Sequence, residues 1–195
     1  MKKIIFSLVI FFSVVSNVNS EEIKRITVGN RDAKVTIIAF ESLTCSHCAN
    51  FHKNVYPDLK RDFLDTGLVK IEFRNFPLDI AAFNASKLAH CRNDGKPEIL
   101  EYLYENQKKW FGDAGTIPEI NENLIKFSKE NMLFYNIRFD DCLEDKMIED
   151  FILNDRIDGA KNFKVNATPT IIINNEKFEK TLNYKNLKKA LEKMI

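Results

Sequence analysis

The stretch VTIIAFESLTCSHCANFH, residues 35–52, joins a predicted strand to a predicted helix and carries two cysteines at the junction. The segment AKVTIIAFES (33–42) is rich in β-branched and apolar residues, which predicts a buried strand. Beyond the cysteines, an apolar stripe with a spacing of four residues predicts a helix and consists of Phe51, Val55, Leu59 and Phe63. Pro57 should kink this helix, and Gly67 should end it.

A second predicted strand completes a βαβ unit. In LVKIEFRNF (68–76), apolar residues alternate with charged ones, as in a strand with one buried face. Because the helix gives a crossover of sufficient length, the two strands should be parallel. Residues 78–163 then carry helical spacing throughout, which predicts a block of about four helices without a strand.

The C-terminal part returns to strands. TPTIIINN (168–175) predicts one strand and EKFEKTL (176–182) its hairpin partner, with a turn at Asn174-Asn175. A closing helix is predicted from an apolar face that consists of Tyr184, Leu187, Leu191 and Met194. Residues 21–77 and 164–195 should therefore form one α/β domain, into which the helical block 78–163 is inserted.

The N-terminal segment has the pattern of a secretory signal peptide. A basic start, MKK, precedes an apolar run of twelve residues, IIFSLVIFFSVV, and small or neutral residues follow up to Ser20. The alternative is a transmembrane anchor, for which the run is short. We therefore expect cleavage after about Ser20 and export of residues 21–195.

The overall charge excludes an electrostatic argument for nucleic acid or for an anionic membrane. The chain has 29 basic and 28 acidic residues, a formal net charge of +1, and removal of Lys2 and Lys3 would leave a formal charge of −1. Such a balanced chain is not expected to bind nucleic acid.

Export changes the interpretation of the four cysteines, because disulfides persist outside the cytoplasm. Four cysteines allow three pairings, and the sequence alone does not choose among them. Cys45 and Cys48 already form a local unit, which leaves Cys91 and Cys142 for each other. The alternative for the second pair is two separate free thiols.

The Cys45–Cys48 spacing is compatible with three uses. At a helix N-terminus, the helix dipole favours a Cys45 thiolate, which attacks a disulfide, and Cys48 can resolve the mixed disulfide. His47 could add positive charge or donate to the Cys45 sulfur. A metal site would use Cys45, Cys48 and His52, but no second closely spaced ligand pair exists in the sequence. A purely structural bridge would close a very small loop and stabilise little.

A second motif, ATPT at 167–170, precedes the predicted C-terminal strand. With it, the chain resembles the thioredoxin superfamily, and the helical insertion makes it similar to the DsbA-like thiol:disulfide oxidoreductases of bacterial envelopes. The motifs of the resemblance are VTIIAFESLTCSHCANFH, RNFPL, AHCRNDGKPEILEYLYENQ and VNATPTIIINN, and it covers essentially all of 25–195. It implies an α/β thioredoxin fold with an inserted helical domain, and it implies no cofactor and no metal.

The resemblance also implies roles for individual residues. Cys45 matches the nucleophile of the family, Cys48 matches its resolving cysteine, and His47 belongs to the dipeptide that tunes the couple. Thr168 and Pro169 match the cis-proline loop, which packs over the two cysteines and contacts the substrate backbone. Some relatives carry a second, non-catalytic disulfide in the helical domain, so Cys91 and Cys142 are expected to form a structural one.

One position departs from the pattern. Relatives usually carry an acid six residues before the first cysteine, where it accepts a proton from the buried thiol, and here that position is Ala39. Glu41 lies on the same alternating face and could replace the acid. The alternative for Glu41 is a solvated carboxylate at the end of the strand.

These inferences predict an exported, periplasmic thiol oxidase that introduces disulfides into reduced, newly exported proteins. A quinone-linked membrane partner of the DsbB type would reoxidise it. Within the same chemistry, the alternative is an isomerase or reductase. Because only residues 21–33 precede the first predicted strand, they leave little to build a dimer with, and a monomer is expected. A non-catalytic metal-binding protein or chaperone is the alternative from a different class.

Overall fold

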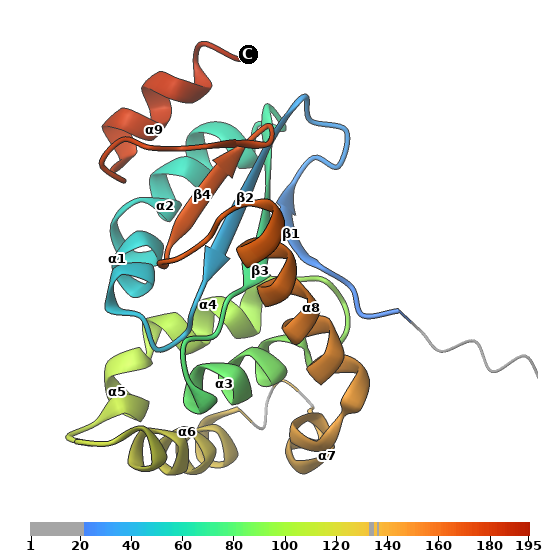
Figure 1. Ribbon diagram of the computed structural model, residues 1–195, viewed down its shortest axis with the longest axis vertical. Coiled ribbons are helices and arrows are strands. Elements are labelled where there is room, and N and C mark those ends of the chain that lie inside the picture. The colour runs from blue at the N-terminus through green and yellow to red at the C-terminus, as the bar shows by residue number, and fades with distance from the viewer. Residues whose placement is uncertain (1–21, 133–134, 136) are drawn as a thin grey trace, which may run out of the picture.

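The computed structural model describes residues 22–132, 135 and 137–195. The predicted signal peptide, residues 1–20, lies outside the described residues. Within the described part, every helix is too short or too polar to cross a lipid bilayer. The centre of the fold is a mixed sheet of five strands in the order β1-β3-β2-β4-β5 (Figure 1).

The strands of the βαβ unit form as predicted. Strand β2 pairs in parallel with β3, and Ile37 lies opposite Ile71 in the register. The predicted strand 33–42 is β2 and the predicted strand 68–76 is β3. The strands span β1 Ile26–Gly29, β2 Val35–Glu41, β3 Val69–Asn75, β4 Thr170–Ile173 and β5 Glu176–Lys177.

Strand β1 was not predicted. It pairs antiparallel with β3 at the edge of the sheet, and its buried residue is Ile26. Four residues are too short to show a clear alternation. Part of the segment 21–33, which the sequence suggested as a mere lead-in, is therefore a strand of the sheet.

The C-terminal hairpin is shorter than predicted. Asn174 and Asn175 have φ angles of 47° and 70°, as a two-residue hairpin turn of the primed type requires. The predicted partner strand 176–182, however, is ladder-paired only at Glu176 and Lys177. Both residues are exposed and charged, as is typical of a short edge strand.

The helical stripe after the cysteines breaks near Pro57, as predicted. Helix α1 ends at Asn54, α2 starts at Tyr56, and a π-helical turn η1 follows. The helices span α1 Ser46–Asn54, α2 Tyr56–Leu59, η1 Lys60–Leu64, α3 Ile80–His90, α4 Glu98–Glu105, α5 Gln107–Phe111, α6 Ile117–Asn131, α7 Phe139–Glu144, α8 Lys146–Asn162 and α9 Tyr184–Leu191.

The helical block contains more breaks than the expected four helices. Within the described residues, the chain between β3 and β4 forms α3 to α8. Asn106 separates α4 from α5, and its side-chain amide donates to the Tyr102 carbonyl. Asp145 separates α7 from α8 because it caps α8, accepting from the backbone N–H groups of Met147 and Ile148.

The sheet is covered on both faces, and α3, α5, α6 and α7 of the helical block lie beyond one end of it (Figure 1). Helices α1, α2 and α9 lie on one side, where Leu187 and Leu191 are fully buried. Met194, predicted on the same apolar face, lies beyond α9 and is exposed. On the other side, α8 approaches so closely that a Cβ atom at Gly159 would lie 2.8 Å from the Phe40 ring.

Candidate active site

The turn between β2 and α1 positions Cys45. Strand β2 ends at Glu41, and Cys45 is the N-cap residue of α1 in an extended conformation. The Cys45 backbone N–H donates to the Ser42 carbonyl at 2.9 Å, which closes the turn. The neighbouring Thr44 hydroxyl donates to the Asp79 carboxylate at 2.6 Å. Because Asp79 caps α3, this bond ties the turn to the helical block.

Cys45 is half-buried and strongly acidic for a thiol. A hydrogen bond from the Cys48 side chain is the largest of the effects that lower the pKa of Cys45 to about 5, and partial burial opposes them. The Thr168 side chain and the backbone N–H groups of Cys48 and His47 add to the lowering. The N-terminus of α1 thus stabilises a thiolate at Cys45.

Cys48 has the opposite character. It is fully buried, and burial raises the pKa of the Cys48 thiol far above its usual range. The neighbouring Cys45 sulfur and the Glu41 carboxylate raise the pKa further. Both cysteines are free thiols in the structure, so one sulfur of the pair is poised as a thiolate and the other as a thiol.

The ATPT segment packs against Cys45. The Thr168–Pro169 peptide bond is cis, and the Cys45 thiol donates to the Thr168 carbonyl at 3.2 Å. A pocket of about 340 Å³ opens beside this contact. It is lined by His47, Asn50, Phe51, Thr168, Pro169, Thr181 and Leu182.

His47 is at the surface and lines this pocket. The sequence is compatible with an imidazole that adds charge and with one that donates to the Cys45 sulfur. Among the groups that stabilise the Cys45 thiolate, His47 contributes through its backbone N–H.

Glu41 is buried, so the solvated strand-end carboxylate considered from the sequence is wrong. Its side chain is 4% exposed, and its Oε2 atom lies 2.8 Å from Nε2 of His52. His52 was considered from the sequence as a metal ligand, together with the two cysteines. In the structure its side chain is 5% exposed and pairs with Glu41 instead. The described residues contain no group of three or more potential ligands that could hold a metal ion.

Two residues of the helical block reach the active site, and sequence analysis identified neither. Gln107 is buried, and its amide donates to the carbonyls of Leu43 and Cys45 at 2.8 and 3.2 Å. The Tyr104 ring stacks on His52 with a centroid distance of 4.0 Å. Both lie about 60 residues from the cysteines, within the segment AHCRNDGKPEILEYLYENQ (89–107) that carries part of the resemblance, but nothing in that segment singles out these two residues.

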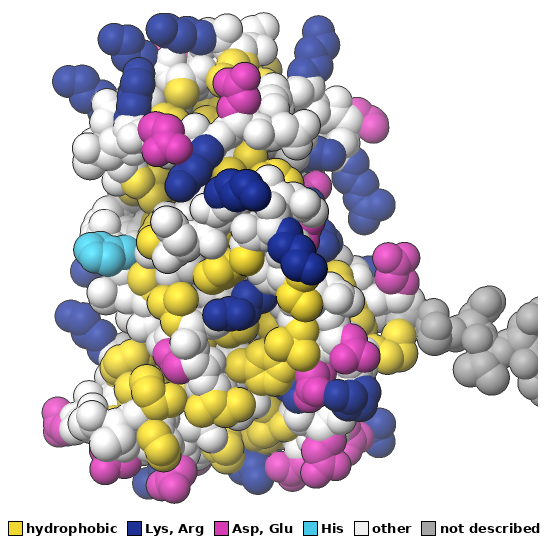
Figure 2. All heavy atoms as spheres, in the orientation of Figure 1, with side chains coloured by type: hydrophobic (Ala, Val, Ile, Leu, Met, Phe, Trp, Pro, Cys, Tyr) yellow, Lys and Arg dark blue, Asp and Glu magenta, His cyan; other side chains and the backbone are white. Residues whose placement is uncertain are grey.

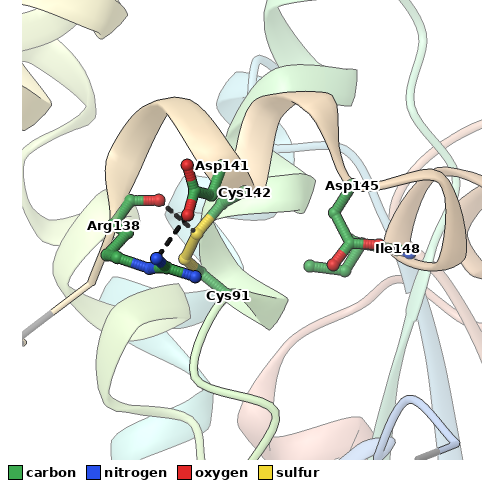
Figure 3. The surroundings of a disulfide bond; sticks show 6 residues. All are labelled: Cys91, Arg138, Asp141, Cys142, Asp145 and Ile148. Atoms are coloured by element: carbon green, nitrogen blue, oxygen red, sulfur yellow. Dashed lines mark hydrogen bonds and ion pairs between the residues drawn. A yellow bond between two sulfur atoms is a disulfide. The ribbon is translucent and has the colours of Figure 1, made fainter. Parts of the chain in front are cut away.

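The second cysteine pair lies elsewhere. Cys91 and Cys142 form a disulfide that joins the C-terminal end of α3 to α7, with a Cα–Cα distance of 5.4 Å (Figure 3). Arg138 and Asp141, on the α7 side, form an ion pair beside it. Asp79, which contacts the active-site turn, is at the other end of α3. The disulfide is therefore about 18 Å along the helix from that contact.

Comparisons with known proteins agree with this arrangement. A family model described as Thioredoxin matches residues 21–193. The chain is 26% identical to the disulfide bond formation protein D of Bacillus subtilis (strain 168), over 86% of this chain and 76% of that protein. It is 33% identical to a putative protein-disulfide oxidoreductase of Rickettsia bellii over 43% of this chain, and the match spans 33% of that relative's length.

A solved structure gives the same result in three dimensions. The crystal structure of Wolbachia pipientis alpha-DsbA1 superposes with a TM-score of 0.75 at 26% identity, over 87% of this chain and 90% of that one. The predicted thioredoxin fold with an inserted helical domain is confirmed. The chain thus belongs to the thioredoxin family, and it is similar to DsbA-like proteins and to disulfide bond formation proteins.

Proposed function

We propose that this protein is an exported thiol oxidase that introduces disulfides into reduced proteins through Cys45 and Cys48. The observation that carries the proposal is the contrast between the two thiols. A stabilised Cys45 thiolate stabilises the reduced form of the couple, and a couple with a stable reduced form is a strong oxidant.

The reaction follows from the placement of the two sulfurs. In the oxidised enzyme, a substrate thiolate attacks the half-buried Cys45 sulfur, the Cys45–Cys48 bond breaks, and Cys48 leaves with the electron pair. A second substrate thiolate then attacks the substrate sulfur of the mixed disulfide. Cys45 leaves as a thiolate, which its low pKa favours. The substrate loses two electrons, and the enzyme gains them as two reduced cysteines.

Glu41 is the proposed proton carrier for Cys48. The Cys48 thiolate is a poor leaving group because burial disfavours its charge, so it needs a proton when the disulfide opens. Glu41 is buried, pairs with His52 and acts electrostatically on Cys48. It donates the proton in the oxidising direction and accepts it when the disulfide re-forms.

The surface around Cys45 supports an unfolded polypeptide as the substrate. The pocket beside Thr168 and Pro169 is open to a main chain that approaches the Cys45 sulfur. Leu78 and Ile80 are 53% and 51% exposed on either side of Asp79, next to the active-site turn. Figure 2 shows that hydrophobic side chains gather over the lower half of one face, in the region of the helical block.

The compartment and the partners belong to the same proposal. We infer export to the periplasm with loss of residues 1–20, because the N-terminal sequence has the pattern of a signal peptide. A quinone-linked membrane protein of the DsbB type would accept the two electrons from the reduced enzyme. We expect the enzyme to act as a monomer, which sedimentation of residues 21–195 would test.

The reduction potential tests the direction of electron flow. We expect equilibration with glutathione buffers to give a potential well above that of cytosolic thioredoxin, which is about −270 mV. The oxidised protein should also form disulfides in a reduced model substrate. A thioredoxin-like potential, together with efficient reduction of insulin, would contradict the oxidase and favour a reductase. Efficient refolding of a scrambled substrate would favour an isomerase.

A further inference from the structure

A buried tyrosine of the helical block lies behind the active-site cysteines. Tyr104, on α4, is 5% exposed, and its hydroxyl oxygen has no nitrogen or oxygen hydrogen-bond partner within the described residues. A buried polar group without a partner costs about 1–3 kcal/mol. Such a group in a native protein therefore requires an explanation, and a role in the chemistry of the site is one.

The surroundings of Tyr104 connect it to Glu41. Its ring stacks on the imidazole of His52 with an interplanar angle of 20°. The Nε2 atom of that imidazole pairs with Oε2 of the Glu41 carboxylate. The other carboxylate oxygen, Oε1, is also buried and has no partner among the described residues. Two unpartnered oxygens, one phenolic and one carboxylic, thus belong to side chains packed against the same ring.

The electrostatics place the hydroxyl near the cysteines as well. Burial raises the pKa of Tyr104 well above its usual range, and the charges of Glu41, Cys48 and Cys45 and the interaction of the hydroxyl with the Cys48 side chain raise it further. The phenol is therefore protonated at every pH at which the protein works. It is a neutral proton donor beside groups that gain or lose negative charge during the reaction.

A second tyrosine packs against His52, but its hydroxyl already has a hydrogen-bond partner. Tyr56 also packs against His52, with a ring distance of 5.3 Å, but its hydroxyl donates to Glu101 at 2.8 Å. Of these two tyrosines at His52, Tyr104 is the one whose hydroxyl interacts with the Cys48 side chain.

We propose that Tyr104 relays the proton between the Glu41–His52 pair and the Cys48 sulfur. When the Cys45–Cys48 bond breaks, Cys48 leaves as a thiolate, and the Tyr104 hydroxyl gives its proton to that sulfur. The phenol oxygen takes back the one proton that the Glu41–His52 pair holds. The step ends with a Cys48 thiol, a neutral Tyr104 and a Glu41–His52 pair that has lost one proton. The relay runs backwards when the disulfide re-forms. This inference rests on the proposed function of Cys48.

The variant Tyr104→Phe removes the hydroxyl and keeps the ring. We expect it to slow the oxidation of a reduced peptide by about 10-fold or more, because general acid–base assistance contributes typically 10²–10⁴-fold. Its free energy of unfolding in urea should change by no more than about 1 kcal/mol, because the lost hydroxyl has no nitrogen or oxygen partner. The matched control is Tyr102→Phe, which makes the same change on the same helix at a hydroxyl that donates to the Asn131 carbonyl. The control should oxidise the peptide at the wild-type rate.

A double-mutant cycle separates the relay from a packing effect. If Tyr104 and Glu41 act in one relay, Tyr104→Phe combined with Glu41→Gln should be no slower than the slower single variant. Both single variants should also change the pH dependence of the rate in the same way. Additive losses, an unchanged pH profile, or a Tyr104→Phe rate equal to that of Tyr102→Phe would overturn the relay.

The outcomes also distinguish the relay from the proposed function. A wild-type protein that fails to oxidise the peptide would contradict the oxidase itself. A wild-type protein that oxidises the peptide, next to an equally active Tyr104→Phe variant, would contradict only the relay. Should Tyr104→Phe fail to fold, the stability expectation above is wrong, and the relay is overturned with it.

Discussion

The two cysteine pairs of this protein differ in every physical respect. Cys45 and Cys48 are three residues apart, lie where β2 passes into α1, and are both free thiols. Cys91 and Cys142 are 51 residues apart and are bonded to each other across α3 and α7. In the first pair the pKa of Cys45 is lowered and the pKa of Cys48 is strongly raised. The second pair does not titrate while it is bonded.

The difference shows that the local environment of a cysteine decides its chemistry. Backbone N–H groups and a neighbouring side chain stabilise charge at Cys45, while burial opposes charge at Cys48. The Cys91–Cys142 bond instead closes a long loop of the helical block. We therefore assign exchange to the first pair and stability to the second, and each assignment can be tested against the other.

The largest expected effect separates the pairs by activity. Cys45→Ser should lower the rate of substrate oxidation by at least about 1,000-fold, because the exchange passes through a covalent bond to this sulfur. The control is the double variant Cys91→Ser/Cys142→Ser, which should keep the rate within about 3-fold of wild type. Both variants are measured on the same reduced peptide. If they lose the same factor in oxidation rate, the two cysteine pairs do not differ in function. Peptide binding that survives in an inactive Cys45→Ser protein is compatible with the enzyme, whereas full oxidising activity would mean that the exchange takes place at another site.

The second prediction reverses the comparison by measuring stability. Removal of the Cys91–Cys142 disulfide should lower the free energy of unfolding by about 4 kcal/mol at most, the chain-entropy value for a loop of this length. Urea unfolding of Cys91→Ser/Cys142→Ser without reductant, beside Cys45→Ser with its Cys91–Cys142 disulfide intact as the control, measures it. If the double variant unfolds at the wild-type midpoint, the second pair has no structural role of this kind.

A smaller effect concerns pH and the polar network next to the second pair. His90, adjacent to Cys91, is buried, and its Nε2 atom lies 3.0 Å from the Asn75 amide. Burial and the nearby Arg25 charge lower the pKa of His90 to about 4, from 6.5. Between about pH 4 and pH 6.5, His90 is thus protonated in the unfolded chain and neutral in the folded protein. Stability should be complete above about pH 6.5 and should fall towards pH 4, by about 3 kcal/mol at most.

The measurement compares urea unfolding of wild type and His90→Gln at several pH values from 4 to 7.5. Because other groups titrate equally in both proteins, the difference between the two curves isolates His90. The wild-type curve should fall more steeply with decreasing pH than the variant curve. Parallel curves would show that His90 does not contribute to the pH dependence.

Much of the fold could be predicted because the deciding signals are local. The alternation in β3, the stripe of α1 and η1, and the two asparagines of the hairpin turn each carry their structure within a few residues. The breaks at Asn106 and Asp145 were missed because apolar spacing continues across them. Strand β5 was predicted too long because nothing in EKFEKTL indicates where an edge strand loses its partner.

The candidate site was predictable to the same extent and for the same reason. Cys45, Cys48, Thr168 and Pro169 belong to short motifs, and the structure brings them together. Glu41 and His52 were each considered alone, as a proton acceptor and as a metal ligand. Their pairing depends on how α1 packs against β2.

Tyr104 and Gln107 show where sequence reasoning ends. Both come from the helical block, and both reach the cysteines only through long-range packing. No spacing or composition in the sequence relates α4 and α5 to the active-site turn.

The central claim is that the fold makes Cys45 a stable thiolate while Cys48 stays protonated. Ultraviolet thiolate absorbance of the reduced protein, followed from low to high pH, measures this most directly. The account predicts one transition with a midpoint at about pH 5, because the pKa of Cys48 lies far above the accessible range. The transition should vanish in Cys45→Ser and persist in Cys91→Ser/Cys142→Ser. A midpoint near the ordinary thiol value of 9.0 would contradict the account.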